Sequence, residues 1–146
     1  MLTRTITILF ILTAFISCSK DTSNGTNSYN PGYMSAYIGS SYWYATTGYA
    51  QTPNVNAINL YAAYNNQSHI SIALGGYTGP GNYILGGFNG ADFYDGNGND
   101  YTATSGTITI TSDNGTQVLG IFTFSGIGSF TGGEVSITGG QFNLTR

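Results

Sequence analysis

The sequence predicts an all-β protein, and its composition, residue periodicity and turn residues all point to that class. The 146 residues include 22 Gly and 12 Tyr, whereas charged residues make up only 6%. Ala, Glu, Lys and Leu are too few to build helices, while Tyr, Thr, Ile and Phe suit a pleated, half-buried surface. From Met34 onward, apolar residues stand at every second position, which is the period of a strand. We expect a single antiparallel β-sandwich, or alternatively a flattened up-and-down β-barrel.

Residues 1–17 have the pattern of a lipoprotein signal peptide. Arg4 is an early cation, and an apolar run follows from Ile6 to Ile16. The run is too short to span a bilayer, so it is typical of a cleavable leader and not of a membrane helix. Phe15-Ile16-Ser17-Cys18 ends the run and resembles the lipobox at which lipoprotein leaders are cut, with Phe15 where Leu is usual.

Cys18 is the only cysteine, so it has no disulfide partner within the chain. The lipobox resemblance implies lipidation of Cys18 and an anchor in the outer membrane, on the cell surface or the periplasmic face. Each buried methylene of the acyl chains adds about 0.8 kcal/mol to anchoring. Residues 18–33 are rich in Ser, Asn, Thr and Gly and predict a lipid-anchored flexible tether. The all-β domain is then residues 34–146.

The charge balance excludes one class of partner. After cleavage of the leader, Lys20 and Arg146 are the only basic side chains. Nucleic acid binding needs a basic patch, so no nucleic acid partner is expected. Electrostatic docking on an anionic membrane surface is excluded for the same reason, and we expect membrane contact through the lipid anchor only.

The strands expected in the first two-thirds of the domain begin with a hairpin, in which Gly39-Ser40 makes the turn. Its return strand places Trp43 and Ala45 on one face. Later turns are expected at Gly75-Gly76 and at Thr78-Gly79-Pro80-Gly81. The alternating or strand-like segments are, in order, Met34, Ala36 and Ile38; Ile58, Leu60, Ala62 and Tyr64; Ile70, Ile72 and Leu74; Tyr83 to Leu85; and Ala91 to Tyr94.

The last third predicts two more hairpins. Asp113-Asn114-Gly115 is expected to turn the chain between the first pair of strands, and Gly139-Gly140 between the second. The residues expected to alternate on these strands are Ile108 and Ile110; Val118, Gly120, Phe122 and Phe124; Val135 and Ile137; and Phe142 and Leu144.

Three pieces of this pattern together resemble a family of small Bacteroidetes lipoproteins known as a domain of unknown function. The pieces are Met34-x-Ala36-x-Ile38 followed by Trp43-x-Ala45; Gly106 to Ile110 with Gly120 to Phe124; and Ile137-Thr138-Gly139-Gly140-Gln141-Phe142. The resemblance covers about residues 34–146. It implies an all-β fold and export, and it brings no activity with it.

One loop has the composition of a calcium site. Residues 95–100, Asp-Gly-Asn-Gly-Asn-Asp, place carboxylate and amide oxygens between glycines, as a loop around a hard cation requires. Asp100 stands where an EF-hand loop needs Gly, and Gly106 stands where it needs a bidentate Glu. The alternative is an ordinary Asx- and Gly-rich turn. No cofactor is expected beyond weak calcium binding, for which the candidate ligands are Asp92, Asp95, Asn97, Asn99 and Asp100.

Outward-facing tyrosines are the candidate binding surface. Their flat faces can stack on pyranose rings while the hydroxyls remain polar, and Asn59 lies near enough in sequence to bond sugar hydroxyls. The alternative is that cross-strand tyrosine pairs stabilise the sheet and bind nothing. Trp43 shares its face with Ile38 and Ala45 and is expected in the core. The candidate ligand-binding residues are Tyr37, Tyr42, Tyr44, Tyr61 and Asn59.

Catalytic chemistry is not expected. His69 is the only histidine, so a His-rich zinc site is excluded, and its alternation with Ile70 and Ile72 places it toward solvent. Nearly all acidic residues stand in turns, where Asp is favoured for backbone reasons. We therefore expect a non-catalytic cell-envelope protein, an accessory or interaction protein with a polymer or protein partner. The alternative is a neutral glycan-binding module.

Overall fold

The computed structural model describes residues 33–146, which form an antiparallel sheet of ten strands. The predicted leader, Cys18 and the tether up to residue 32 lie outside these residues. Within the described range, no helix has the length and hydropathy of a membrane span. The strands are β1 (Tyr33–Ile38), β2 (Ser41–Tyr44), β3 (Thr47–Asn54), β4 (Ala57–Tyr64), β5 (Ser68–Leu74), β6 (Gly81–Ile84), β7 (Asn89–Tyr94), β8 (Asp100–Asp113), β9 (Gln117–Gly128) and β10 (Glu134–Thr145).

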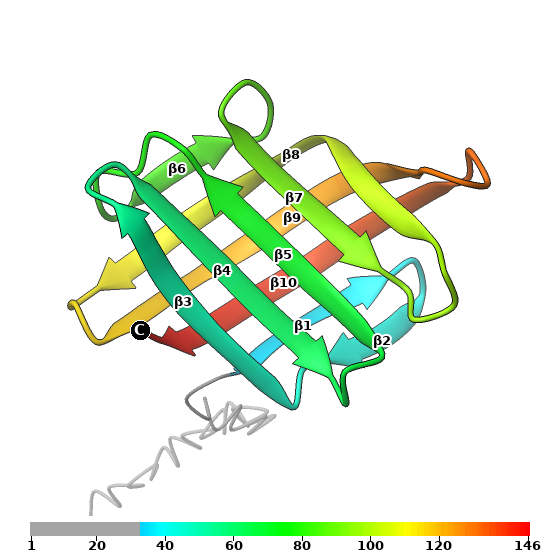
Figure 1. The fold of residues 1–146 in the computed structure, drawn as a ribbon, viewed down its shortest axis with the longest axis horizontal. Helices are drawn as coiled ribbons and strands as arrows, with labels where there is room; N and C mark the ends of the chain where they lie inside the picture. The colour runs from blue at the N-terminus through cyan, green and yellow to red at the C-terminus, as the bar shows by residue number, and fades with distance from the viewer. Residues whose placement is uncertain (1–32) are drawn as a thin grey trace, which may run out of the picture.

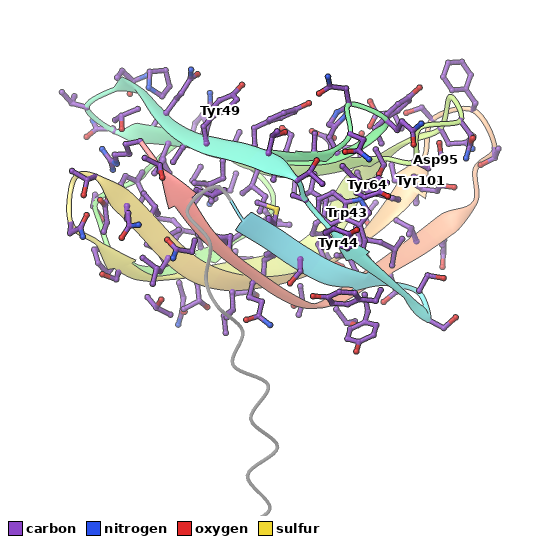
Figure 2. The ribbon with its side chains drawn as sticks, turned by 90° about the horizontal axis from the view of Figure 1, so that it is seen from below. Trp43, Tyr44, Tyr49, Tyr64, Asp95 and Tyr101 are labelled. Carbon is purple, nitrogen blue, oxygen red and sulfur yellow. The ribbon has the colours of Figure 1, made fainter. Side chains whose placement is uncertain are left out.

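The sheet folds over on itself as a half-barrel with two layers. Its strand order is β2-β1-β10-β9-β8-β7-β5-β4-β3, and β6 pairs with β8 beside this path. Figure 1 shows β3, β4, β5 and β7 lying across β8, β9, β10 and β1, and Figure 2 shows the two layers from the side. The predicted all-β antiparallel class is confirmed, and one continuous sheet supplies both layers.

Strand β8 belongs to both layers. Its first part pairs with β7, and its second part pairs with β6. One extra residue interrupts its register with β9 between Ala103 and Ser105, and another between Ile110 and Ser112. Such bulges bend a strand and increase its twist, so β8 carries the sheet from one layer into the other.

A two-residue link joins the opposite ends of the sheet. Strands β2 and β3 are the first and last in the strand order, yet only Ala45 and Thr46 separate them in the chain. The Ala45 amide donates to the Met34 carbonyl on β1 (2.7 Å), and the Thr46 amide donates to the Ala63 carbonyl on β4 (2.9 Å). The chain therefore steps from one layer to the other within a single peptide unit.

The core fills the space between the layers. Its largest fully buried side chains are Phe122, Phe142, Met34, Ile58, Leu60, Ile70, Ile72, Leu74, Ile108, Ile110, Ile137 and Leu144. The expected burial of Trp43 is confirmed, at 9% exposure. Its indole Nε1 donates to Ser68 Oγ on β5 at 2.8 Å, which satisfies the one polar atom of the ring. Within the described residues, the core runs from Met34 to Leu144.

Strand β3 was not predicted, because its sequence has almost no alternation. Ala50 is its only buried residue, and Gly48 and Pro53 interrupt the pattern. Both suit an edge strand, where a missing amide is tolerated. Gly48 is needed because a Cβ there would lie 2.9 Å from both Leu144 Cδ2 and the Tyr61 carbonyl oxygen.

The hairpin predicted at Gly139-Gly140 is wrong, because β10 runs unbroken from Glu134 to Thr145. Between Ile137 and Gly140 it advances three residues while β9 advances two, from Phe124 to Phe122. Gly139 takes a left-handed φ of +58° at this bulge. A Cβ on Gly140 would lie 2.6 Å from ring carbons of Phe122. The glycine pair therefore marks a bulge packed on an aromatic ring.

We expect Gly120→Ala to lower the free energy of unfolding by about 2–3 kcal/mol, as forced overpacking does. The new Cβ would lie 2.2 Å from the Thr109 carbonyl oxygen and 2.4 Å from Phe142 Cζ. Gly90→Ala is the matched control, because nothing lies within 4 Å of a Cβ there. Its effect should stay within about 0.5 kcal/mol. Urea titration of both variants gives the comparison, and equal stability would contradict this account of the packing.

Candidate functional site

Three tyrosines form a row on the outer face of the β1–β2 hairpin. Tyr37 pairs with Tyr42 across the hairpin, and the neighbouring pair of Ala36 and Trp43 points into the core. Tyr44 follows Tyr42 on the same face of β2. Tyr37, Tyr42 and Tyr44 are 48%, 54% and 45% exposed. We call these three residues the tyrosine row.

The rings of the tyrosine row are in contact and still open to solvent. The centroids of Tyr37 and Tyr42 lie 5.4 Å apart in an edge-to-face arrangement, and those of Tyr42 and Tyr44 lie 6.4 Å apart with planes 25° from parallel. Tyr44 also meets Tyr64 of β4 edge-to-face at 5.3 Å. The charge interaction with the Tyr64 phenol and a hydrogen bond to it raise the pKa of Tyr44. Tyr64 thus fixes one end of the row.

A second set of aromatic rings crosses the outer face of the other layer, with one residue from each of β3, β4, β5 and β7. Its rings, in order, belong to Tyr49, Tyr61, His69 and Tyr94. Neighbouring centroids lie 5.3–5.4 Å apart with planes tilted by 30–37°. At that spacing, rings cannot lie side by side in one plane, so their faces pack partly on one another. This cross-strand stack presents less open ring face than the tyrosine row.

Three of the five predicted ligand-binding residues form the tyrosine row. The other two lie apart from the row, on β4. Tyr61 lies in the cross-strand stack, and Asn59 lies on β4 opposite Gln51 and Ala73. The contributions of Tyr49 and Tyr94 to the stack, and that of Tyr64 to the row, were not predicted. His69 lies on the outer face as expected, but it is half-buried between two tyrosine rings. Only the pairing register of distant strands could have revealed these contacts.

The candidate calcium loop is organised around Asp95. One oxygen of its carboxylate, Oδ1, accepts hydrogen bonds from the amides of Asn97 (2.7 Å) and Asn99 (3.2 Å). The other, Oδ2, accepts one from Asn99 Nδ2 (2.8 Å). The side-chain bond from Asn99 is the main reason that the pKa of Asp95 is lowered, and the backbone bonds add to it. The loop therefore folds as an Asx turn closed on an ionised carboxylate.

The other candidate calcium ligands stand on the strands beside this loop. Asp92 is in β7, paired with Ser71 and Thr102, and Asp100 opens β8 opposite Tyr94. Among the residues that the structure describes, no three His, Cys, Asp or Glu side chains converge as a metal-ligating group. Asn97 and Asn99 side chains and backbone carbonyls would have to complete the coordination. Calcium binding here stays a prediction from the sequence.

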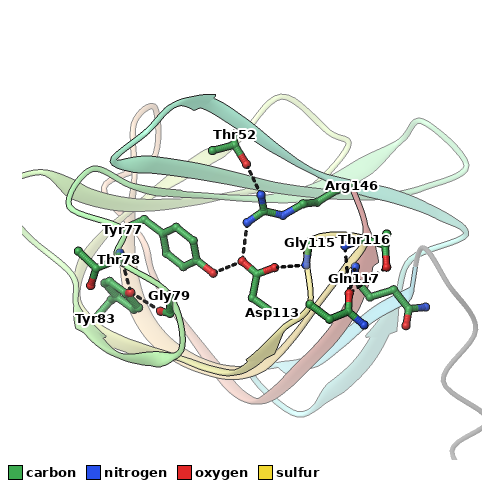
Figure 3. Close-up of polar contacts among 11 residues, drawn as sticks. Thr52, Tyr77, Thr78, Gly79, Tyr83, Asp113, Gly115, Thr116, Gln117 and Arg146 are labelled. Carbon is green, nitrogen blue, oxygen red and sulfur yellow. Dashed lines mark hydrogen bonds and ion pairs between the residues drawn. The ribbon is translucent and has the colours of Figure 1, made fainter.

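One titratable cluster ties the layers at the end of the domain opposite Trp43 (Figure 3). Tyr77 and Arg146 both donate to Asp113 Oδ2, and Arg146 Nη1 also donates to Thr52 Oγ1 at 2.7 Å. The Gly115 amide donates to the second carboxylate oxygen, Oδ1, at 3.0 Å. These side chains are engaged with one another and join β3 to the ends of β8 and β10.

The pKa values of this cluster follow from its geometry. Burial, and then the hydrogen bond to Asp113, raise the pKa of Tyr77 to about 12. Burial alone would raise the pKa of Asp113, but Tyr77, the Gly115 amide and the Arg146 charge together bring it below the ordinary value. The carboxylate is therefore ionised and the phenol neutral at physiological pH.

Comparisons of this chain with protein-family models, with curated proteins and with solved structures found no match.

The cluster predicts that the free energy of unfolding falls in acid and in alkali. The lowered pKa of Asp113 means that its stabilisation is present above the ordinary value of 3.8 and is lost as pH drops through the folded-state pKa. The raised pKa of Tyr77 means that its stabilisation is present below pH 10.0 and is lost as pH rises toward about 12. Urea titrations at a series of pH values measure both losses of stability, which we call the acid limb and the alkaline limb of the stability–pH curve.

Tyr77→Phe should reduce the loss of stability at alkaline pH. Tyr83→Phe is the control, because it removes the same hydroxyl from the neighbouring ring, whose centroid lies 5.7 Å away. Because Tyr83 bonds only to the backbone of Thr78 and Gly79 in the described contacts, that control should keep the alkaline limb. An alkaline limb that is the same in both variants would show that Tyr77 is not its source.

Calcium binding at the Asp95 loop predicts a higher melting temperature of the domain in millimolar calcium, because a ligand that binds only the folded state stabilises it. Magnesium at the same concentration is the control for ionic strength. A melting temperature that calcium leaves unchanged would refute the site.

Proposed function

We propose that this protein is a non-catalytic, lipid-anchored cell-envelope protein and that its tyrosine row binds a neutral glycan. The observation that carries the proposal is the exposure of three contiguous tyrosine rings on one hairpin, each about half open to solvent. The sequences of β1 and β2 contain no charged residue. A neutral ligand can therefore approach this hairpin without stripping water from an ion.

The chemistry of the row suits a sugar ring. The apolar face of a pyranose packs against an aromatic face, and phenol hydroxyls at the ring edges can bond to sugar hydroxyls. Thr138 lies opposite Tyr37 on the neighbouring strand β10 and is exposed, so a further hydroxyl borders the row. Tyrosine also loses little conformational entropy on binding, because it has only two side-chain torsions.

The remaining parts of the proposal rest on the sequence. The lipobox at Cys18 supports an anchor in the outer membrane, facing the surface or the periplasm, and the tether leads directly into the hairpin that carries the row. The absence of catalysis is proposed because Asp113 and Tyr77 serve the link between layers and His69 packs between two rings. None of these three side chains is placed beside the tyrosine row, where it could act as a base.

The test measures binding of residues 29–146, which contain every core residue of the described range, to a panel of neutral glycans. Binding should be saturable, and Tyr42→Ala should weaken it about tenfold, the effect of losing roughly 1.4 kcal/mol of contact. Tyr61→Ala is the control, because it removes a ring of the cross-strand stack on the other layer. It should lower stability and leave affinity unchanged.

If Tyr61→Ala lost affinity and Tyr42→Ala did not, the glycan site would be assigned to the cross-strand stack instead of the tyrosine row. Absence of binding across the whole panel would refute the glycan proposal and favour a protein partner for the same exposed hairpin.

A further inference from the structure

A cavity opens between the two layers at the end of the domain where Trp43 lies. Its volume is about 350 Å³, near the lower limit for sites that hold small molecules. Figure 2 shows Trp43, Tyr101 and Asp95 near one another at this end. We call it the end cavity. The residues that line it are Ile38, Ser41, Tyr42, Trp43, Ser68, Phe93, Asp95, Tyr101 and Val135.

Four of the nine residues that line the end cavity are aromatic. Trp43, Phe93, Tyr42 and Tyr101 come from three different parts of the sheet, and the rings of Phe93 and Tyr101 stack with centroids 6.0 Å apart. The negative face of such rings attracts a cation that comes within about 6 Å of the ring centroid, and indole attracts it most strongly.

Two polar side chains of the end cavity, Ser68 and Asp95, already accept hydrogen bonds within the protein. Ser68 Oγ already accepts the indole N–H of Trp43. The Asp95 carboxylate already accepts three hydrogen bonds from its own loop. A sugar ring brings several hydroxyls that each need a partner when buried, because an unpaired buried polar group costs about 1–3 kcal/mol. An alkylammonium ion makes no such demand.

The end cavity also carries a negative charge that no Lys or Arg of the described residues balances. Of the residues that the structure describes, Arg146 is the only Lys or Arg. It follows the far end of β10, whereas the end cavity lies at the β10 start, beside Val135, and its guanidinium is bound to Asp113 and Thr52. The three donors to Asp95 are neutral amides, so the charge of its carboxylate remains.

We propose that the end cavity binds an organic ammonium ion, with the aromatic rings of Trp43, Phe93 and Tyr101 around the cation and the Asp95 carboxylate beside it. Ser41 and Tyr42 are the solvent-exposed residues of the lining, so we expect a substituent of the ammonium group to extend toward solvent past β2. The proposal does not depend on glycan binding at the tyrosine row. It differs from a calcium site at the same loop, because the aromatic wall offers calcium no oxygen ligands.

The experiment titrates residues 29–146 with tetramethylammonium chloride and follows tryptophan fluorescence. Trp43 is the only tryptophan in the chain, so the signal comes from a residue that lines the end cavity. We expect a saturable change with tetramethylammonium and none with tert-butanol, which has a similar shape and no charge. Sodium chloride at matched concentration controls for ionic strength. A response to tert-butanol equal to that of the ammonium ion would overturn the proposal, and so would the absence of saturation.

Two variants locate the site. Asp95→Asn should weaken tetramethylammonium binding about tenfold, and Asp92→Asn, which makes the same charge change three residues away in β7, should leave it unchanged. Since Asp95→Asn also alters the loop, Tyr101→Leu provides a second measure by removing an aromatic face while keeping apolar volume. Unchanged affinity in either Asp95→Asn or Tyr101→Leu would overturn the proposal. Displacement of the ammonium ion by micromolar calcium would assign the loop to a metal instead.

Discussion

The structure depends on one constraint, which is that a single sheet must cover its own apolar face. Strands β3, β4, β5 and β7 lie over the other half of the same sheet, and no helix of the described residues contributes to the core. Two polar ties hold the halves together. The indole of Trp43 bonds to Ser68 at one end, and Arg146 joins Asp113 to Thr52 at the other. Each tie satisfies buried or half-buried polar atoms that would otherwise weaken the apolar contact.

The need to cover the apolar face also determines which side chains point outward from the sheet. Side chains alternate along each strand, so every buried Ile or Leu brings an outward neighbour, and in this chain many of these are tyrosines. Where four strands lie side by side, the outward rings stack across them and become part of the sheet. On the edge hairpin β1–β2, the rings have neighbours on fewer sides and remain open. Whether outward rings stack or stay open to solvent thus depends on their position in the strand order.

The sequence predicted local features well and long-range ones poorly. Gly39 and Gly115 adopt left-handed φ values in the turns expected of them, because a tight turn is decided by a few adjacent residues. The tyrosine row was predictable for the same reason, since Tyr37 and Tyr42 belong to one hairpin. The stack from Tyr49 to Tyr94 depends on the register of four strands, and the bulge at Gly139 depends on the Phe122 ring below its neighbour. Neither leaves a mark in the nearby sequence.

The pairing of the first strand with the last has a consequence for how the chain matures. Met34 lies opposite Phe142, so about a hundred residues separate the two partners, and closing so long a segment carries an entropic cost. The hairpin β1–β2 precedes the other described strands in the chain, but the outer edge of β1 has no strand to pair with until β10 is available. Most pairs from β3 to β10 join strands that are neighbours in the chain, with β5 pairing to β7 and β6 to β8, so we expect these pairs to form before β1 docks on β10. Until that pairing forms, one edge of β10 is open to wrong partners, and the docking of β1 is the step that covers it.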